Sequence, residues 1–189
     1  MVGRVNDQGI VLTTDRFAYV SLCEVAKRPG TVLVLDHIND PQNFGAVLRA
    51  GLAFGIAGVI LPADRSVAVT PAVVNASAGA VEQLAVAQVT NLVRSLRELR
   101  TGGRWAIGLD TGEDSQPLPT AEIPLPAVLV LGSEGRGISA QVRKQCELIL
   151  SIPIEESVES LNVATAGAIA LYELNRRQLE ISLIRSVSI

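Results

Sequence analysis

The polar residues best suited to chemistry lie in three separate stretches of the 189-residue chain. These stretches are Asn43-Phe-Gly-Ala-Val-Leu-Arg49, Gly132-Ser-Glu-Gly-Arg-Gly137 and Ser160-Leu-Asn162. They supply amides, a guanidinium, a carboxylate and a hydroxyl, which can orient a substrate and stabilise developing charge. Each also has an ordinary structural explanation: a helix-start Asn with a solvated Arg, a solvated turn residue, and a helix N-cap. Taken one at a time, the stretches favour these structural explanations.

The glycine-rich stretch directly follows the apolar run 127–131, as nucleotide-binding loops follow a strand. Its order, Gly-x-x-Gly-x-Gly, reverses the dinucleotide-binding fingerprint, and no acidic residue at the expected spacing completes a ribose contact. A Walker A sequence is also absent. The stretch therefore predicts a tight turn with exposed backbone N–H groups rather than a Rossmann site or a P-loop.

A hydrolase triad would have to use His37, which is the single histidine of the chain. It would need His37 near Ser133 or Ser160, together with an acid such as Asp36 or Glu134. The G-x-S-x-G elbow that exposes a serine nucleophile in α/β hydrolases is absent. A loop histidine with a structural hydrogen bond is the favoured interpretation.

Composition limits the class of protein. Apolar residues make up 48% of the chain and aromatic residues 3%, so the core consists of Leu, Ile, Val and Ala. The net charge of -3 gives no overall attraction to nucleic acid or anionic lipid. Cys23 and Cys146 lie far apart without metal-ligand spacing, so we expect two reduced thiols and no zinc site. No signal pattern occurs, and no apolar run reaches the ~20 residues of a membrane span. We expect a soluble, cytoplasmic protein.

Apolar runs that alternate with amphipathic stretches predict βαβ units, and thus an α/β fold with a parallel sheet flanked by helices on both faces. The expected strands are 31–36, 58–61, 84–89, 105–110, 127–131 and 148–153. The expected helices are 42–54, 72–80, 91–100, 139–145 and 162–178, the first of them started by Asp40 and Pro41. Residues 111–126 are predicted to be a loop, and the tail 179–189 cannot be placed. Residues 1–30 are predicted to be a linker with an edge strand at 9–12 and a short helix at 17–26, followed by one domain at 31–189.

Ligands of open parallel sheets bind at the carboxyl ends of the strands. Two expected strands, 127–131 and 148–153, end in the second and third polar stretches, so the function is predicted there. Asn43 and Arg49 are six residues apart and do not share a helical face. For both to reach one site, Asn43 must act from the first turn of its helix.

Together, the three stretches resemble the three motifs of the SpoU (TrmH-like) ribose methyltransferases of the SPOUT superfamily. The matching residues are Asn43-x-Gly-x-x-x-Arg49, Leu129-Val-Leu-Gly-x-Glu134-Gly-x-Gly137 and Ile152-Pro-x6-Ser-Leu-Asn162-Val. The similarity covers about residues 31–178. Short segments outside the motifs, of which Pro62-x-Asp-Arg-Ser66 is one, resemble the branch that modifies a guanosine ribose in large-subunit ribosomal RNA.

The resemblance implies a SPOUT-type domain whose C-terminal part forms a deep trefoil knot, with S-adenosylmethionine bound in that knot. It also implies a homodimer with the site near its interface, an RNA substrate, and no requirement for a metal. By the same resemblance, the backbone at Gly132, Ile152 and Leu161 holds the cofactor. The catalytic and substrate-binding residues that it implies are Arg49, Asn43, Glu134, Ser160 and Asn162.

The implied reaction is an in-line attack of a ribose 2′-oxygen on the sulfonium methyl group. The family assigns the counterpart of Arg49 to activation of that hydroxyl, but arginine is a poor base because its pKa is above roughly 12. We favour the hypothesis that Arg49 stabilises the developing alkoxide while a substrate phosphate helps to take the proton. Asn43 and Glu134 would orient Arg49 or the RNA, and Ser160 and Asn162 would position the polar atoms of the site.

Three alternatives stay open: methylation of a tRNA ribose, a non-catalytic RNA- or cofactor-binding protein on this scaffold, and a small-molecule hydrolase. The intact motif residues argue against the second and the missing elbow against the third. Relatives usually carry a small RNA-binding domain before the segment at Gln8 and Gly9, and almost nothing precedes it here. We therefore expect either a fragment or another route to RNA, and the acidic charge balance agrees with a missing basic surface.

Overall fold

A computed structural model of the protein describes residues 15–64 and 66–187, and within them seven parallel strands form one sheet. The strands are β1 (Val32–Leu35), β2 (Gly58–Pro62), β3 (Val86–Val89), β4 (Trp105–Leu109), β5 (Gln116–Pro117), β6 (Ala127–Leu131) and β7 (Leu148–Ser151). Their order across the sheet is β3-β2-β1-β6-β4-β7-β5. Every residue of β1, β2 and β6 is buried, which occurs where helices cover both faces of a sheet. The predicted parallel α/β architecture is therefore confirmed.

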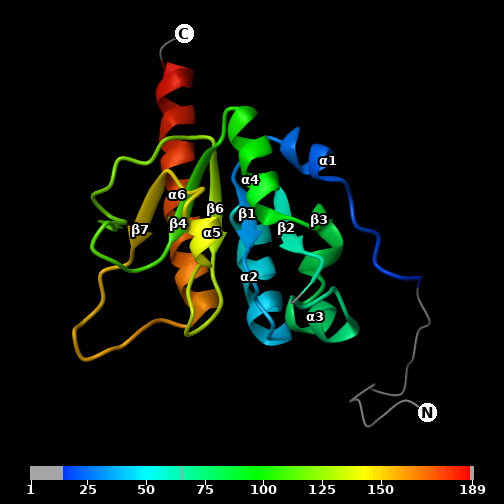
Figure 1. Ribbon diagram of the computed structural model, residues 1–189. Helices are drawn as coiled ribbons and strands as arrows, with labels where there is room; N and C mark the ends of the chain where they lie inside the picture. Colours follow the sequence, from blue (N-terminus) through cyan, green and yellow to red (C-terminus); the bar gives the residue numbers. More distant parts are fainter. Residues whose placement is uncertain (1–14, 65, 188–189) are drawn as a thin grey trace.

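The helices form a layer on each face of the sheet (Figure 1). One layer contains α2 (Pro41–Ala53), α3 (Pro71–Ala76), the short 3-10 helix η1 (Ala80–Gln83) and α6 (Val163–Val187). The other contains α1 (Leu22–Ala26), α4 (Leu92–Thr101) and α5 (Ala140–Arg143). None of the helices within the described ranges is long and apolar enough to cross a membrane.

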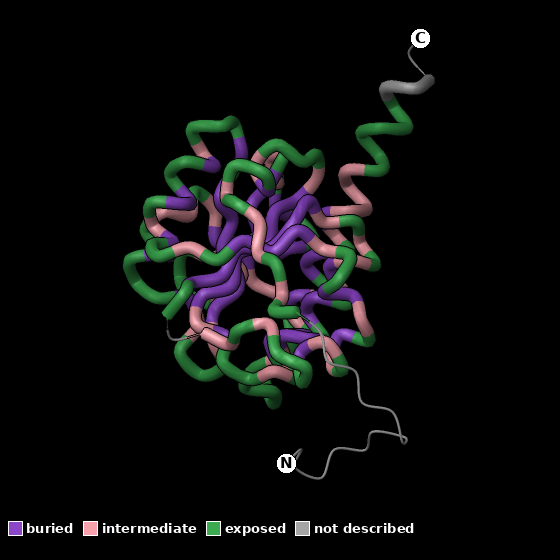
Figure 2. Tube along the Cα trace, turned by 90° about the vertical axis from the view of Figure 1, so that its right-hand side faces the viewer, coloured by how far each residue is buried: buried purple, intermediate pink, exposed green. Residues whose placement is uncertain are grey.

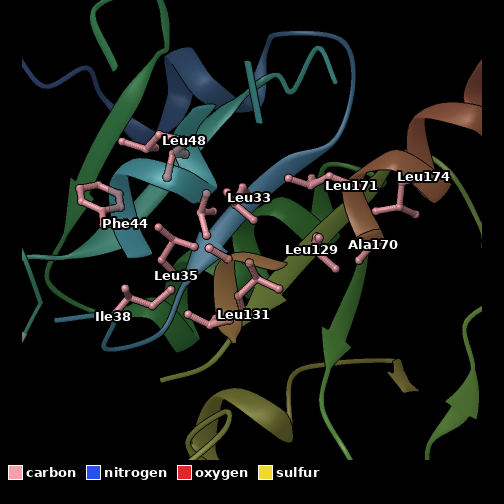
Figure 3. Packing of buried hydrophobic residues seen from close by; sticks show 14 of the residues in the cluster. Leu33, Leu35, Ile38, Phe44, Leu48, Leu129, Leu131, Ala170, Leu171 and Leu174 are labelled. Atoms are coloured by element: carbon pink, nitrogen blue, oxygen red, sulfur yellow. The ribbon is translucent and has the colours of Figure 1, made fainter. Parts of the chain in front are cut away.

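Alternate strand residues point to opposite layers, so the core has two halves separated by the sheet. The strand register aligns one row of side chains beneath α2 and α6: Val86, Val59, Leu33, Leu129 and Ile107. Leu171 and Leu174 of α6 pack on the same side (Figure 3). Buried positions concentrate at the centre of the molecule, whereas residues 179–184 of α6 project from it and are exposed (Figure 2).

Helix α2 begins where the sequence predicts. The Asp40 carboxylate accepts hydrogen bonds from the backbone N–H groups of Gln42 and Asn43, and Pro41 occupies the first turn. A Cβ atom on Gly45 would overlap Ala76, so only glycine allows α2 and α3 to approach this closely. This start fixes Asn43 in the first turn, next to the carboxyl end of β1.

The strand order reverses next to β1. From β1 the chain proceeds to β2 and β3 on one side, whereas β6, β4, β7 and β5 lie on the other. Such a reversal opens a crevice outside the carboxyl ends of the strands, and ligands of open α/β sheets bind there. The second and third polar stretches follow β6 and β7 at this edge.

Several predicted boundaries are wrong. Helix α3 ends at Ala76 rather than Ala80, because Ala78 and Gly79 adopt positive φ angles of 51° and 78° that interrupt the helix. The helix expected at 17–26 covers only Leu22–Ala26, started by a capping box of Ser21 and Glu24. The strand expected at 9–12 lies outside the described residues. Helix α6 continues to Val187 rather than ending at 178.

The segment 111–126 is more ordered than the predicted loop. It contains β5, which pairs with β7 at the edge of the sheet, and it then returns to β6 along α6. Leu118 and Ala121 are buried in the same cluster as Leu171 and Leu174 of α6. We refer to residues 118–121, which lie between β5 and β6, as the return segment.

Candidate functional site

A cleft of about 590 Å³ lies at the carboxyl ends of β4, β6 and β7, next to the start of α6. Its size is within the range of small-molecule sites in proteins. Six of the residues singled out from the sequence line it: Gly132, Glu134, Ile152, Ser160, Leu161 and Asn162. The carboxyl edge of the sheet therefore brings the second and third polar stretches to one place.

The glycine-rich stretch forms a closed loop after β6. Ser133 N donates to Gly137 O at 3.1 Å, and Gly137 N donates to Ser133 O at 2.9 Å. A Cβ atom on Gly132 would overlap the backbone of Gly137 and Ile138, so no other residue fits there. The predicted tight turn is confirmed, but two of its backbone N–H groups serve to close the loop. Gly132 presents its bare backbone to the cleft.

Three side chains from the three polar stretches meet beside the cleft. Asn162 Nδ2 donates to Asn43 Oδ1 at 2.8 Å and to Glu134 Oε1 at 2.7 Å. Both hydrogens of the Asn162 amide group are thereby used. Among the described residues nothing is bonded to Asn43 Nδ2 or to Glu134 Oε2, so this cluster retains amide donors and a carboxylate acceptor for a ligand.

Asn162 is also the N-cap of α6. Its Oδ1 atom accepts from Ala164 N at 2.9 Å and from Thr165 N at 3.3 Å. Because this atom accepts from backbone N–H groups, the other end of the amide must be the donor toward Asn43 and Glu134. The structural and functional explanations of this residue are therefore compatible.

The remaining predicted residues differ in position. Ser160 is exposed and lines the cleft beside Leu161. Arg49 is exposed on α2, does not line the cleft, and has no hydrogen-bond or ion-pair partner within residues 15–64 and 66–187. At about 100° per residue, it lies roughly 240° around the helix from Asn43. The structure brings Asn43, Glu134 and Asn162 into contact and leaves Arg49 outside the cleft of its own chain.

Two acids support the glycine-rich loop from the neighbouring strands. The sequence suggested Asp36 only as the acid of a hydrolase triad and did not single out Asp110. Asp36, directly after β1, accepts from Ser139 N at 2.7 Å, and Asp110, directly after β4, accepts from Ile138 N at 3.4 Å. Asp110 also lines the cleft and pairs with Arg143 at 3.4 Å. Both acids follow strands that flank β6, so the strand order would have identified them.

His37 has the structural role expected from the sequence. Its Nδ1 atom lies 2.5 Å from Oδ1 of the buried Asp36 carboxylate. Its φ angle of 61° is rare for a residue other than glycine. No serine hydroxyl within the described ranges is hydrogen-bonded to His37, so these ranges contain no Ser–His–Asp triad built on His37.

Both cysteines are free thiols. Burial raises the pKa of Cys146 to about 12, so this thiol stays protonated and unreactive at neutral pH. Cys23 is exposed on α1, which lies in the other helix layer from α2 and α6. Neither residue lines the cleft.

A family model described as the SpoU rRNA Methylase family matches residues 30–172. The chain belongs to this SpoU family. The expected family resemblance is thereby confirmed over most of the sequence.

Relatives of the SpoU chain agree with this assignment. It is 40% identical over 183 residues to an "Uncharacterized tRNA/rRNA methyltransferase" of Mycolicibacterium paratuberculosis, covering 94% of this chain and 59% of that protein. It is 40% identical over 178 residues to the "23S rRNA (guanosine-2'-O-)-methyltransferase RlmB" of Coxiella burnetii, covering 93% of this chain and 70% of that protein. The chain thus spans about three fifths of the first relative's length.

The fold is similar to that of a solved structure, the AdoMet-bound rRNA methyltransferase from Sinorhizobium meliloti. The TM-score is 0.77 at 26% sequence identity, covering 85% of this chain and 61% of the other.

Proposed function

We propose that this chain transfers a methyl group from S-adenosylmethionine to a ribose 2′-hydroxyl of RNA, at a guanosine of large-subunit ribosomal RNA. The contact of Asn162 with both Asn43 and Glu134 carries this proposal, because it joins the three polar stretches at one cleft. The name of the Coxiella burnetii relative supports the nucleotide and the RNA. The AdoMet-bound Sinorhizobium meliloti structure supports the methyl donor.

The cleft suits S-adenosylmethionine in size and chemistry. Ile152 and Leu161 give it apolar walls for a flat base, and a side chain at Gly132 would collide with the loop backbone. The backbone at Gly132, Ile152 and Leu161 would hold the cofactor. When bound, the cofactor supplies an activated methyl group on a sulfonium.

The protein has to orient the ribose hydroxyl and stabilise its charge as the proton leaves. Asn43 Nδ2 and Glu134 Oε2 have no hydrogen-bond partner in the part of the chain that the structure describes, so they are available to hold the nucleotide. Asn162 fixes their positions. Ser160 supplies a further hydroxyl at the cleft. Arg49 would stabilise the alkoxide through its guanidinium, with a substrate phosphate taking part in removal of the proton.

We also propose a homodimer that completes this site. Ile169 and Tyr172 on the outer face of α6 are 39% and 55% exposed, and Tyr172 packs edge-on against Phe54 of α2. A second copy that covers this apolar face would lie next to α2, which carries Arg49. Because Arg49 does not line the cleft of its own chain, we place its guanidinium at the cleft of the second copy.

A deep trefoil knot in the C-terminal part belongs to the same proposal. Residues 110–126 run from β4 to the sheet edge and back to β6, and the return segment 118–121 is hydrogen-bonded to α6. Helix α6 packs between α2 and this segment in the core beneath β6. A knot of this kind requires that the connection form a loop through which the later part of the chain passes, and the contact of residues 118–121 with α6 supports this proposal.

Incubation of the purified protein with methyl-labelled S-adenosylmethionine and unmodified ribosomal RNA tests the proposed function. We expect label at one guanosine, mapped as a 2′-O-methyl ribose, and no label with an Asn43→Ala and Glu134→Ala double variant. Label on a base, or none on any RNA while the cofactor binds, would overturn the proposed reaction.

Mixing Arg49→Ala subunits with Asn162→Ala subunits tests whether two copies share a site. Recovered activity would support the shared site, and no recovery would contradict it.

A further inference from the structure

Arg177 on α6 uses its guanidinium to hold the return segment 118–121. Its Nη1 atom donates to Ala121 O at 2.6 Å and its Nη2 atom to Leu118 O at 3.1 Å. Its Nε atom donates to Glu173 Oε1 at 2.7 Å, which fixes the guanidinium plane. The Arg177 side chain is 18% exposed. One cation therefore satisfies two backbone carbonyls of a segment that precedes it by more than fifty residues.

The return segment is attached in turn to the wall of the cleft. Leu118 N donates to Ser151 O at 2.8 Å, and Pro117 pairs with Ser151 in the register of β5 and β7. Ser151 and the following Ile152 line the cleft. Ile152 is one of the residues proposed to hold the cofactor.

Arg177 itself does not line the cleft. It lies fourteen residues after Val163, the first residue of α6, which corresponds to about 21 Å along the helix. Any effect of Arg177 on a ligand must therefore pass through the return segment and the end of β7.

From these contacts we propose that Arg177 is a positioning residue for the methyl-donor cleft. It fixes Leu118, and through the bond of Leu118 to Ser151 it fixes the backbone at Ile152. This inference rests on the proposed function, because it takes S-adenosylmethionine as the occupant of the cleft. Without Arg177 the return segment keeps its buried apolar side chains and the Leu118–Ser151 hydrogen bond, but the carbonyls of Leu118 and Ala121 lose the guanidinium that holds them. The end of β7 then gains freedom that ligand binding must remove.

Arg176 provides a matched control. It also pairs with Glu173, at 2.8 Å, and with Glu180, and its side chain is 40% exposed. It donates to no carbonyl of the return segment. The two arginines share a carboxylate and differ in their contact with residues 118–121.

The experiment compares S-adenosylmethionine binding by calorimetry, and hydrogen exchange at the Leu118 amide, in the full chain and in Arg177→Ala, Arg177→Lys and Arg176→Ala. We expect Arg177→Ala to weaken binding about five- to tenfold and to speed exchange at Leu118. Arg177→Lys, which keeps the charge but not the two-pronged geometry, should fall between it and the wild type. Arg176→Ala should bind as the wild type does.

A kinetic readout separates positioning from general loss of structure. KM for the methyl donor should rise with the dissociation constant, whereas kcat at saturating donor should stay within about twofold, because the reacting groups are unchanged. If Arg177→Ala does not fold, Arg177→Lys carries the comparison. Unchanged exchange at Leu118, or unchanged donor affinity in a folded variant with faster exchange, would overturn the inference. A wild-type protein that binds no donor would instead refute the proposed function on which the inference rests.

Discussion

Arg49 and Arg104 place the same guanidinium group in opposite surroundings. Arg104 is 8% exposed just before β4 and donates to the backbone carbonyls of Ala26, Arg28 and Gly30. Arg49 is exposed on α2 and bonds to no group within the described ranges. Burial lowers the pKa of Arg104, yet an arginine remains charged at neutral pH. A guanidinium whose donors are taken by carbonyls stabilises the fold, whereas one without acceptors is available to a substrate.

Replacement of Arg49 should give the largest effect, and only on catalysis. We expect Arg49→Ala to lower kcat at least about 100-fold, the usual loss when one donor to a developing oxyanion is removed. The affinity for S-adenosylmethionine and the Tm should match those of the wild type, because no described contact is lost. Steady-state kinetics, calorimetry and thermal melting measure the three quantities. Lost donor binding would assign Arg49 to the cofactor instead, and Arg49→Lys separates charge from fork geometry.

Replacement of Arg104 should lower stability and leave the binding of S-adenosylmethionine unchanged. Arg104→Ala leaves three carbonyls of the segment 26–30 without their donor, so the free energy of unfolding should fall by about 3 kcal/mol. The affinity for S-adenosylmethionine, measured well below Tm, should not change, because Arg104 does not line the cleft. Chemical denaturation measures the loss, and Arg94→Ala on the exposed side of α4 is the control. A stability loss no greater than that of the control would remove the contrast between the two arginines.

Asn162 has both a structural role, as the N-cap of α6, and a role in the site, as the donor to Asn43 and Glu134. Two variants can separate these roles. Asn162→Asp keeps an oxygen that caps α6 but loses the donor to Asn43 and Glu134 and adds a second carboxylate beside Glu134. We expect near-wild-type stability and about a tenfold or greater loss of kcat. Asn162→Ala should lose activity and also about 1 kcal/mol of stability. Equal activity in Asn162→Asp and the wild type would show that the cap alone explains this residue.

The smallest expected effect concerns pH and the carboxylate shared by Arg176 and Arg177. The hydrogen bond from Arg176, with that from Arg177, lowers the pKa of Glu173 from 4.5 to about 2. Because the pKa of Glu173 is lower in the folded protein than in the unfolded chain, the ionised carboxylate stabilises the fold at any pH above about 4.5. This stabilisation is lost as the pH falls from about 4.5 to about 2. Denaturation at several pH values in this window should show a steeper loss for the wild type than for Glu173→Gln. Parallel slopes would contradict the ion pairing.

The sequence could predict the elements with strong local patterns. The apolar runs of β1, β2 and β6 and the Asp40–Pro41 start of α2 depend on neighbours along the chain. It could not predict β5, a polar pair of residues that forms a strand only because β7 lies beside it. The end of α3 depends on the backbone conformation of Ala78, which no residue type signals.

The candidate site was predictable only in part, for the same reason. The three polar stretches were visible as motifs, and the helical spacing already separated Arg49 from Asn43. The contact of Asn162 with Asn43 joins residues 119 apart, and the support from Asp36 spans 103 residues. Such contacts follow from strand order, which no local pattern encodes. The roles of Arg104 and Arg177 depend on tertiary contacts in the same way.

A crystal structure of the protein with S-adenosylmethionine is the most direct test of the central claim. The donor should occupy the cleft, with its base against Ile152 and Leu161 and its backbone contacts at Gly132, Ile152 and Leu161. Its sulfonium methyl should face the cluster of Asn43, Glu134 and Asn162. A donor bound elsewhere, or an empty cleft at a donor concentration that saturates the protein in solution, would contradict the claim.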